Sequence, residues 1–230
     1  MVMGHKRVLL FGATGALGGA ISSTFINHGW EVFPVVRVES GLPNEIVLPF
    51  ESESPFEGAN FNTVVFAQGT DMNGTIQTTS DEALTTLFET NVGFIVKKTK
   101  FLLREHAIAR NGHIVIISSL AQVFSHKEKL AYTISKAAVG GLVRSLAVDL
   151  GKSHGILVNG ILPGIVDTSK TQNALAVDQV DHLLGCTPIG KLVTPNDVAN
   201  SVYLLGSELN TAISGQSILV DNAHSVTYLP

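Results

Sequence analysis

A tyrosine and a lysine four residues apart could form an acid/base pair. Tyr132 is the first and Lys136 the last residue of the segment Tyr-Thr-Ile-Ser-Lys at positions 132–136. Residues at this spacing share one face of a helix. The lysine ammonium would then favour the phenolate and lower a pKa that is ordinarily about 10. A tyrosine tuned in this way exchanges protons readily, as hydride transfer to or from a carbonyl group requires.

A serine stands where it could join this pair. Ser119 follows the apolar residues 113–117, where a buried parallel strand would end. Its hydroxyl could stabilise the charge that develops on a substrate oxygen. Taken singly, these three residues have ordinary explanations as turn, cap or surface residues. Their combination is what indicates an active site.

A glycine-rich turn offers a place for phosphate. Residues 12–19 read Gly-Ala-Thr-Gly-Ala-Leu-Gly-Gly, between an apolar run and a segment with helical spacing. Glycines let the backbone turn sharply and approach a pyrophosphate, whose charge is met by N–H groups at the start of the helix. The turn predicts a dinucleotide site, in preference to a strand–helix turn that binds nothing.

The residues after the second apolar run bear on the choice of cofactor. An acidic side chain there would hold the ribose 2′-hydroxyl of NAD, whereas a basic one accommodates the 2′-phosphate of NADP. Arg37 directly follows the run, and Glu39 lies two residues further on. Because a guanidinium suits phosphate, NADP(H) is favoured and NAD(H) is the alternative. Arg37 would otherwise be an ordinary solvated arginine.

The elements that must position these residues alternate along the chain. Short apolar runs predict buried strands at residues 8–11, 32–36, 63–66, 113–117, 156–162 and 217–220. Helical spacing occurs at 17–28, 81–109 and 130–152. The pattern predicts an α/β fold with a single Rossmann-like, doubly wound parallel sheet and helices on both faces. The segment 39–62 is too short and polar for a full strand–helix unit, so one helix that covers the sheet is expected to be abbreviated or missing.

Composition limits the class of protein. With 45% hydrophobic residues, a net charge of -4 and scattered basic residues, residues 1–230 predict one compact domain that does not bind nucleic acid. No apolar run is long enough to predict a membrane span. The single cysteine, Cys186, predicts a reducing, cytoplasmic setting. None of the eight histidines forms a compact pair, so no metal site is expected.

Together these motifs resemble the short-chain dehydrogenase/reductase family, from Val8 to Asp221. The family's Tyr-x-x-x-Lys matches Tyr132 and Lys136, and its active-site serine matches Ser119. Its helix-borne asparagine matches Asn91. The resemblance implies that Tyr132 is the general acid/base and that Ser119 polarises the substrate oxygen. It further implies that Lys136 binds the nicotinamide ribose and that Asn91 supports a water-linked proton relay.

The resemblance and the glycine turn together define the expected cofactor site. Its residues are Gly12, Thr14, Gly15, Ala16, Leu17, Gly18, Arg37, Ala67, Gln68, Gly69, Asn91, Tyr132, Lys136, Pro163, Gly164, Ile165 and Thr168. By the resemblance, the Ile165 backbone and the Thr168 hydroxyl approach the nicotinamide carboxamide and the phosphate. A substrate lid follows at about residues 169–193. The chain departs from the family at Ala16, which replaces a glycine, and at residues 66–69, where Phe-Ala-Gln-Gly replaces Asn-x-Ala-Gly.

The leading hypothesis is an NADP(H)-preferring oxidoreductase that acts on a carbonyl or secondary alcohol. The main alternative is an NADP(H)-binding redox sensor without turnover, and a transient-oxidation epimerase or dehydratase ranks below both. The family also implies a homo-oligomer, a dimer or tetramer, with helices 81–109 and 130–152 between subunits. A moderately hydrophobic substrate would suit the apolar residues Ala121, Val123, Phe124, Ile165 and Leu184.

Overall fold

Seven parallel strands form the centre of the part of the chain that the structure describes. The structure is a computed structural model that describes residues 6–48, 56, 59–174 and 177–227. The strands are β1 Arg7–Phe11, β2 Glu31–Val36, β3 Ile46–Val47, β4 Phe61–Phe66, β5 Ile108–Ile117, β6 Leu157–Pro163 and β7 Ser217–Val220. Their order across the sheet is β3-β2-β1-β4-β5-β6-β7. The predicted doubly wound sheet is confirmed, and its switch point lies between β1 and β4, where ligands bind in such folds.

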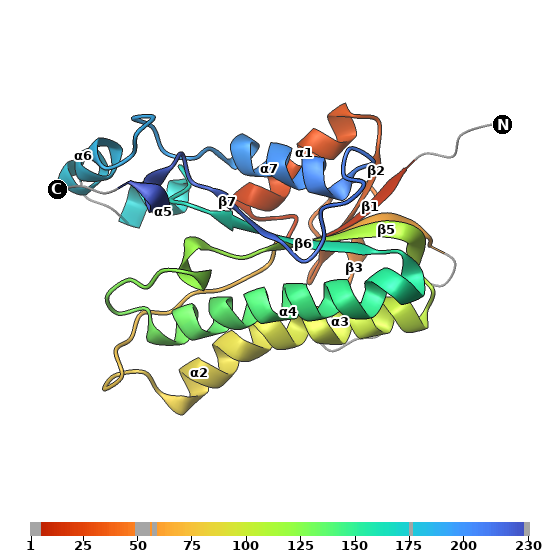
Figure 1. Cartoon of the computed structure of the whole chain (residues 1–230), viewed down its shortest axis with the longest axis horizontal. Coiled ribbons are helices and arrows are strands. Elements are labelled where there is room, and N and C mark those ends of the chain that lie inside the picture. Colours follow the sequence, from red (N-terminus) through yellow and green to blue (C-terminus); the bar gives the residue numbers. More distant parts are fainter. Residues whose placement is uncertain (1–5, 49–55, 57–58, 175–176, 228–230) are drawn as a thin grey trace.

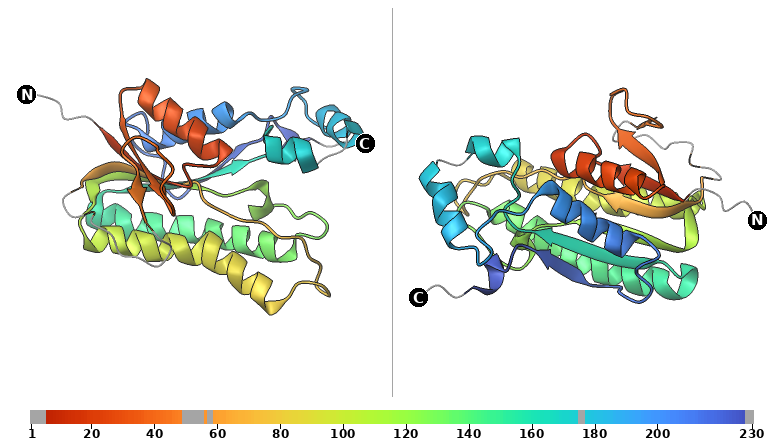
Figure 2. Two further views of the ribbon diagram at one scale, coloured as in Figure 1. Left: turned by 180° about the vertical axis from the view of Figure 1, so that it is seen from behind. Right: turned by 90° about the horizontal axis from the view of Figure 1, so that it is seen from above.

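Helices cover both faces of this sheet, as Figures 1 and 2 show. One face carries α1 (Ala16–Asn27) and α7 (Pro195–Gly206), which bury residues such as Ile21 and Val198 against the strands. The other carries α3 (Phe94–Arg104) and α4 (Leu130–His154), with α2 (Asp81–Phe88) leading into α3. Two short helices, α5 (Ser169–Ala174) and α6 (Val177–Gly185), lie beyond one end of these layers (Figure 1).

The single helix expected over residues 81–109 is wrong in two respects. A π-helical turn, Glu89–Gly93, separates α2 from α3. The helix then ends at Arg104, and residues 108 and 109 already belong to β5. His106 adopts a φ of 51°, which is outside the helical region and turns the chain into the strand. Apolar residues in a helix and in a short strand are hard to separate by periodicity, and this explains the error.

Several elements were absent from the sequence-based expectation, namely β3, α5, α6 and α7. Strand β3 has only two residues and lies inside the stretch 39–62, where one covering helix was expected to be abbreviated or missing. Part of that stretch falls outside the described residues. Helix α7 begins with a capping box, in which the Thr194 hydroxyl accepts from the Asp197 N–H while the Asp197 carboxylate accepts from the Thr194 N–H. The sequence Thr-Pro-Asn-Asp at positions 194–197 carries that signal.

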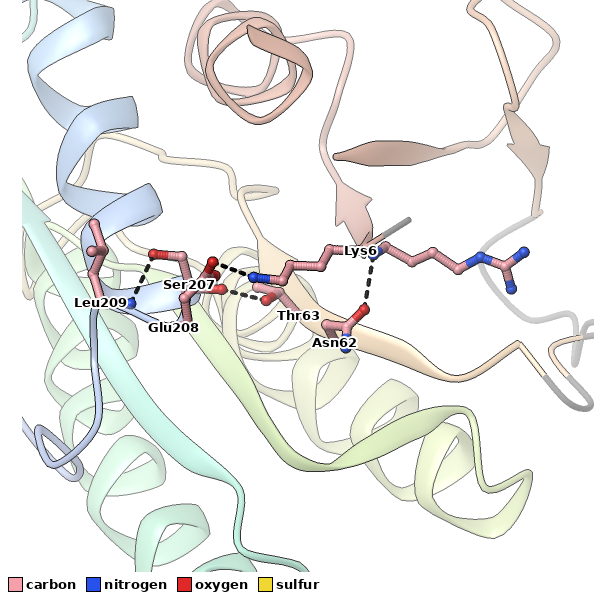
Figure 3. Close-up of polar contacts among 8 residues, drawn as sticks. Lys6, Asn62, Thr63, Ser207, Glu208 and Leu209 are labelled. Carbon is pink, nitrogen blue, oxygen red and sulfur yellow. Dashed lines mark hydrogen bonds and ion pairs between the residues drawn. The ribbon is translucent and has the colours of Figure 1, made fainter. Parts of the chain in front are cut away.

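Polar contacts fasten the amino ends of the strands, away from the predicted site (Figure 3). The Arg7 N–H donates to the Asn62 side chain at 2.9 Å, which joins β1 to β4. The Thr63 hydroxyl donates to the carbonyl of Gly206 at the end of α7, and Lys6 forms an ion pair with Glu208. These contacts anchor α7 at this end of the sheet and leave the carboxyl ends of the strands to form a site.

Candidate active site

The glycine turn lies at the carboxyl end of β1 and leads directly into α1. Gly12 has a φ of 80°, and a Cβ there would lie 2.6 Å from the carbonyl carbon of Ala67. A Cβ at Gly18 would lie 2.1 Å from the Gly12 oxygen. Both positions therefore exclude side chains. No side chain caps α1 at Gly15 and its first turn has no acidic residue, so the first N–H groups suit an anionic ligand.

A cavity of about 670 Å³ adjoins this turn. Its lining includes seven of the expected cofactor residues: Gly12, Thr14, Gly15, Arg37, Ala67, Gln68 and Gly69. Six other expected residues do not line it: Ala16, Leu17, Gly18, Asn91, Tyr132 and Lys136. Arg37 is the residue that directly follows β2 and is exposed, whereas Glu39 is not part of the wall. A volume of this size is typical of small-molecule sites.

The atypical segment after β4 has a clear structural role. Phe66, at the position of the family's asparagine, is 1% exposed and stacks on Phe11 with ring centroids 4.9 Å apart. The Gln68 carboxamide is buried at the cavity wall, and neither its oxygen nor its nitrogen has a partner among the residues that the structure describes. Buried polar groups are nearly always hydrogen-bonded in complete sites. The unpaired amide and the uncapped helix fit a polar, phosphate-bearing cofactor such as NAD(P)(H).

Tyr132 and Ser119 meet at the carboxyl end of β5. Ser119 begins a short 3-10 turn and its hydroxyl accepts from the Ala121 N–H at 3.1 Å. Tyr132, in the first turn of α4, lies close enough to Ser119 for that hydroxyl to affect the pKa of the phenol. Burial raises the pKa of Tyr132, the Ser119 hydroxyl opposes that effect, and the charge of Asp71 adds to it. Burial therefore favours the protonated form of the phenol over the phenolate.

Lys136 lies one turn further along α4 and is buried. Its Nζ donates to the carbonyl of Ile117 at 3.3 Å and lies 5.8 Å from the centre of the Tyr132 ring. Burial lowers the pKa of Lys136 to about 8, against the opposing charge of Asp71. The expectation that this ammonium lowers the pKa of Tyr132 is wrong for this structure, because burial disfavours the charged forms of both side chains.

Asn91 is buried in the π-helical turn and connects three elements. Its Nδ2 donates to the Thr70 carbonyl and to the Ser135 hydroxyl, each at 3.0 Å, and its Oδ1 accepts from the Thr70 N–H at 3.0 Å. π-Helical turns often occur at functional sites. Ser135 was missed by the sequence reasoning, although it stands directly before Lys136. A Cβ on Gly69 would lie 3.3 Å from Asn91 Oδ1 and 3.5 Å from Lys136 Nζ, so these polar groups adjoin the cavity wall.

The Pro163–Gly164 segment lies apart from the 670 Å³ cavity, which none of its residues lines. Gly164 packs against β7, where a Cβ would lie 2.9 Å from Asp221 Cβ. Ile165 lines a much smaller cavity with Leu183 and Thr187. The Thr168 hydroxyl accepts from the Thr171 N–H at 3.2 Å, so it caps the short helix that follows.

The apolar residues expected around the substrate differ in exposure. Val123 and Phe124 are 57% and 47% exposed, just after Ser119, and can meet a ligand. Ala121 is 3% exposed and belongs to the protein interior, because the 3-10 turn points it inward. Among the described residues, no three histidine, cysteine or acidic side chains gather as metal ligands, and none of the helices there has the length and apolarity to cross a bilayer.

Comparisons with known proteins identify the family. Residues 57–223 match the family model described as "Enoyl-(Acyl carrier protein) reductase". The 3-oxoacyl-[acyl-carrier-protein] reductase FabG of Chlamydia muridarum is 30% identical over 243 residues, covering 94% of this chain and 96% of the relative. The Salmonella typhimurium FabG is 27% identical over 235 residues, with the same shares covered.

A solved structure agrees with these relatives in fold. The aldohexose dehydrogenase of Thermoplasma acidophilum superposes with a TM-score of 0.86 at 22% identity, covering 97% of this chain and 95% of that one. The family model spans most of the chain, and the relatives it resembles are reductases and dehydrogenases. The chain therefore belongs to the short-chain dehydrogenase/reductase family of NAD(P)-dependent oxidoreductases that act on CH–OH and C=O groups.

Proposed function

We propose that the chain transfers hydride between NADP(H) and a carbonyl or secondary alcohol, with Tyr132 as the general acid/base. The observation that carries this proposal is that the side chains of Tyr132 and Ser119 are neighbours, with buried Lys136 one helical turn away. The Asn91 network fixes the same helix next to the cavity. A protein that only binds the cofactor has no need for this buried acid/base group.

The chemistry of the proposed reaction follows from these side chains. The bound cofactor would supply the hydride to a carbonyl carbon. The protonated Tyr132 hydroxyl donates its proton to the substrate oxygen, while the Ser119 hydroxyl stabilises the charge on that oxygen. The pKa of Lys136 is about 8, which is close to neutral pH, so its ammonium could give up a proton to a neighbouring group. In alcohol oxidation the proton moves in the opposite direction.

The preference for NADP(H) rests on Arg37. Its position after β2, on the cavity wall, suits a 2′-phosphate, and the nearby Glu39 does not reach that wall. Gly12, Thr14 and Gly15 would hold the pyrophosphate, and the unpaired Gln68 amide would bind a polar group of the cofactor. Lys136 and the 163–168 segment would hold the nicotinamide half.

The substrate is proposed to be small and moderately hydrophobic, bound next to Val123 and Phe124. Residues 169–193, which include helices α5 and α6, would form the lid over the substrate. The chain is further proposed to form a dimer or tetramer through α2, α3 and α4, which expose Phe88, Val96 and Val148. Light scattering on the purified chain tests this assembly, and a monomer at micromolar concentration would contradict it.

Cofactor binding is the first experiment. NADPH and NADH fluorescence titrations are made on the native chain, on Arg37→Ala and on Arg110→Ala, an exposed arginine of β5 that serves as the control. A lost charge-assisted contact predicts roughly tenfold weaker NADPH binding for Arg37→Ala alone. Equal NADPH affinity in all three proteins would remove the assignment of Arg37.

Turnover is the second experiment. A 3-oxoacyl thioester, an aldohexose and a steroid ketone are tested with native, Tyr132→Phe and Tyr203→Phe proteins. Tyr203 lies on α7 and stacks on His28, so it is a control for removal of a phenol. Loss of proton transfer predicts a fall of about a hundredfold or more for Tyr132→Phe only. Full activity of Tyr132→Phe would overturn the acid/base role, and cofactor binding without any turnover would favour a redox sensor.

A further inference from the structure

An ion pair outside the predicted tetrad lies next to Tyr132. Lys129 Nζ is 3.0 Å from Asp71 Oδ2. Asp71 follows β4, two residues after Gly69, and Lys129 directly precedes α4, three residues before Tyr132. The two side chains are only 26% and 36% exposed, so solvent screens them less than a surface pair.

The backbone reinforces this contact. The Gly74 N–H donates to the Glu128 carbonyl at 2.7 Å, and the Leu130 N–H donates to the Gly74 carbonyl at 3.2 Å. Gly74 and Lys129 thus form a parallel β-bridge. The segment after β4 is joined by backbone and side chain to the start of α4, and the first turn of that helix carries Tyr132.

The ion pair also places charge around the phenol. Lys129 Nζ lies 5.7 Å from the centre of the Tyr132 ring, and Lys136 Nζ lies 5.8 Å from it. One cation comes from the turn before Tyr132 and the other from the turn after it. Asp71 supplies a negative charge close to both cations, and Ser119 meets the phenol from the loop after β5.

We propose that Asp71 and Lys129 are positioning residues for the acid/base: their ion pair fixes the first turn of α4 and balances the charge around the Tyr132 hydroxyl. This inference rests on the proposed role of Tyr132 and adds two residues to the site. Consistent with the geometry, the charge of Asp71 raises the pKa of Tyr132 and that of Lys136. Its loss would make the phenol easier to ionise.

The test follows the titration of Tyr132 directly, without cofactor or substrate. The chain is labelled with ¹³Cζ-tyrosine, and the Tyr132 resonance is assigned by its absence in Tyr132→Phe. Asp71→Asn is expected to lower the pKa of Tyr132, because a negative neighbour is lost. Lys129→Gln is expected to raise it, because Asp71 is then left uncompensated. The exposed neighbour Glu128 provides the control variant Glu128→Gln, which keeps the backbone contacts and should titrate like the native chain.

The opposite signs separate charge from simple structural damage. If Asp71→Asn and Lys129→Gln shift the titration in the same direction, or leave it unchanged, the charge-balancing role is wrong. Circular dichroism at each pH confirms that the variants compared are folded. This test does not depend on turnover. The activity of Tyr132→Phe decides the proposed function, whereas the titration shifts in Asp71→Asn and Lys129→Gln decide this inference.

Discussion

The Asn91 amide donates to the Ser135 hydroxyl at 3.0 Å, and that hydroxyl donates to the Tyr132 carbonyl at 2.8 Å. Because Asn91 also exchanges two hydrogen bonds with the Thr70 backbone, one side chain connects the loop after β4, the π-helical turn and the first turns of α4. The side chain that the family associates with a proton relay thus also supports the helix that carries the acid/base. Both Asn91 and Ser135 are buried, so water cannot replace these contacts easily.

Replacing Ser135 should therefore destabilise the protein, because its hydroxyl is buried and hydrogen-bonded on both sides. Ser135→Ala leaves the buried Asn91 amide with one partner fewer, and a cost of about 1–3 kcal/mol in the free energy of unfolding is expected. Urea denaturation measures this cost. Thr133→Ala, on the same helical turn but less buried, is the control and should cost clearly less. Equal losses in the two variants would contradict the buried network.

The two neighbouring glycines at 18 and 19 should respond oppositely to alanine. A Cβ at position 18 would lie 2.1 Å from the Gly12 oxygen, whereas a Cβ at position 19 would have none of the described residues within 4 Å. Gly18→Ala should destabilise the fold by about 1–3 kcal/mol and weaken NADPH binding, because the turn must move. Gly19→Ala should be neutral or stabilise α1 by up to about 1 kcal/mol. Thermal denaturation and cofactor titration distinguish them, and a tolerated Gly18→Ala would show that the turn is less tightly packed.

Much of this fold can be predicted from its sequence, because the apolar runs, the turn glycines and the helical spacing all indicate the same elements. The continuous apolar runs match the buried strands β1, β4 and β5, and the glycine turn lies between β1 and α1 as expected. The spacing of Tyr132 and Lys136 places both on α4. Local periodicity and turn chemistry determine these features, so tertiary contacts do not change them.

The remainder depends on contacts between distant residues. The end of α3 could not be predicted, because Ile108 is apolar enough for a helix and pairs with Phe61 only once the sheet exists. The pKa of Tyr132 was expected to fall, since the sequence shows Lys136 but not the burial of the phenol. The ion pair of Asp71 and Lys129 spans 58 positions and carries no local signal. Burial and long-range pairing are properties of the folded chain.

The capping box of α7 should contribute measurably to stability. The Thr194 hydroxyl accepts from the Asp197 N–H at 3.2 Å, and the Asp197 carboxylate accepts from the Thr194 N–H at 2.8 Å. Thr194→Ala should lower the free energy of unfolding by about 1–2 kcal/mol. Ser201→Ala, which removes a hydroxyl bonded to a carbonyl within the same helix, is the control and should have little effect. A Thr194→Ala protein as stable as the control would argue against the cap.

His113, a buried histidine of β5, should make the free energy of unfolding depend on pH. His113 is 8% exposed, and its Nε2 lies 3.1 Å from the Asn210 carbonyl, which fits a protonated Nε2 on a neutral ring. Burial lowers the pKa of His113 from its ordinary 6.5, although the Asn210 and Asn62 backbones and the charge of Glu208 oppose the shift. Between its lowered value and 6.5 the unfolded chain binds more protons than the folded one. The free energy of unfolding must then fall as the pH decreases through that window.

Urea denaturation of the native chain and of His113→Gln between pH 7.5 and pH 5 tests this sign. The native chain should lose more stability than His113→Gln as the pH falls below about 6.5. Only the native chain has an imidazole that takes up a proton more readily in the unfolded state than in the folded one. His126→Gln, which replaces an exposed histidine, should follow the native curve. The lowered carboxylate pKa values of Asp197 and Glu208 also reduce stability in acid, but they act below the ordinary carboxylate values of 3.8 and 4.5. Parallel native and His113→Gln curves above pH 5 would mean that the imidazole is hydrated or protonated within the fold, and that its contact with Asn210 is made by the charged ring.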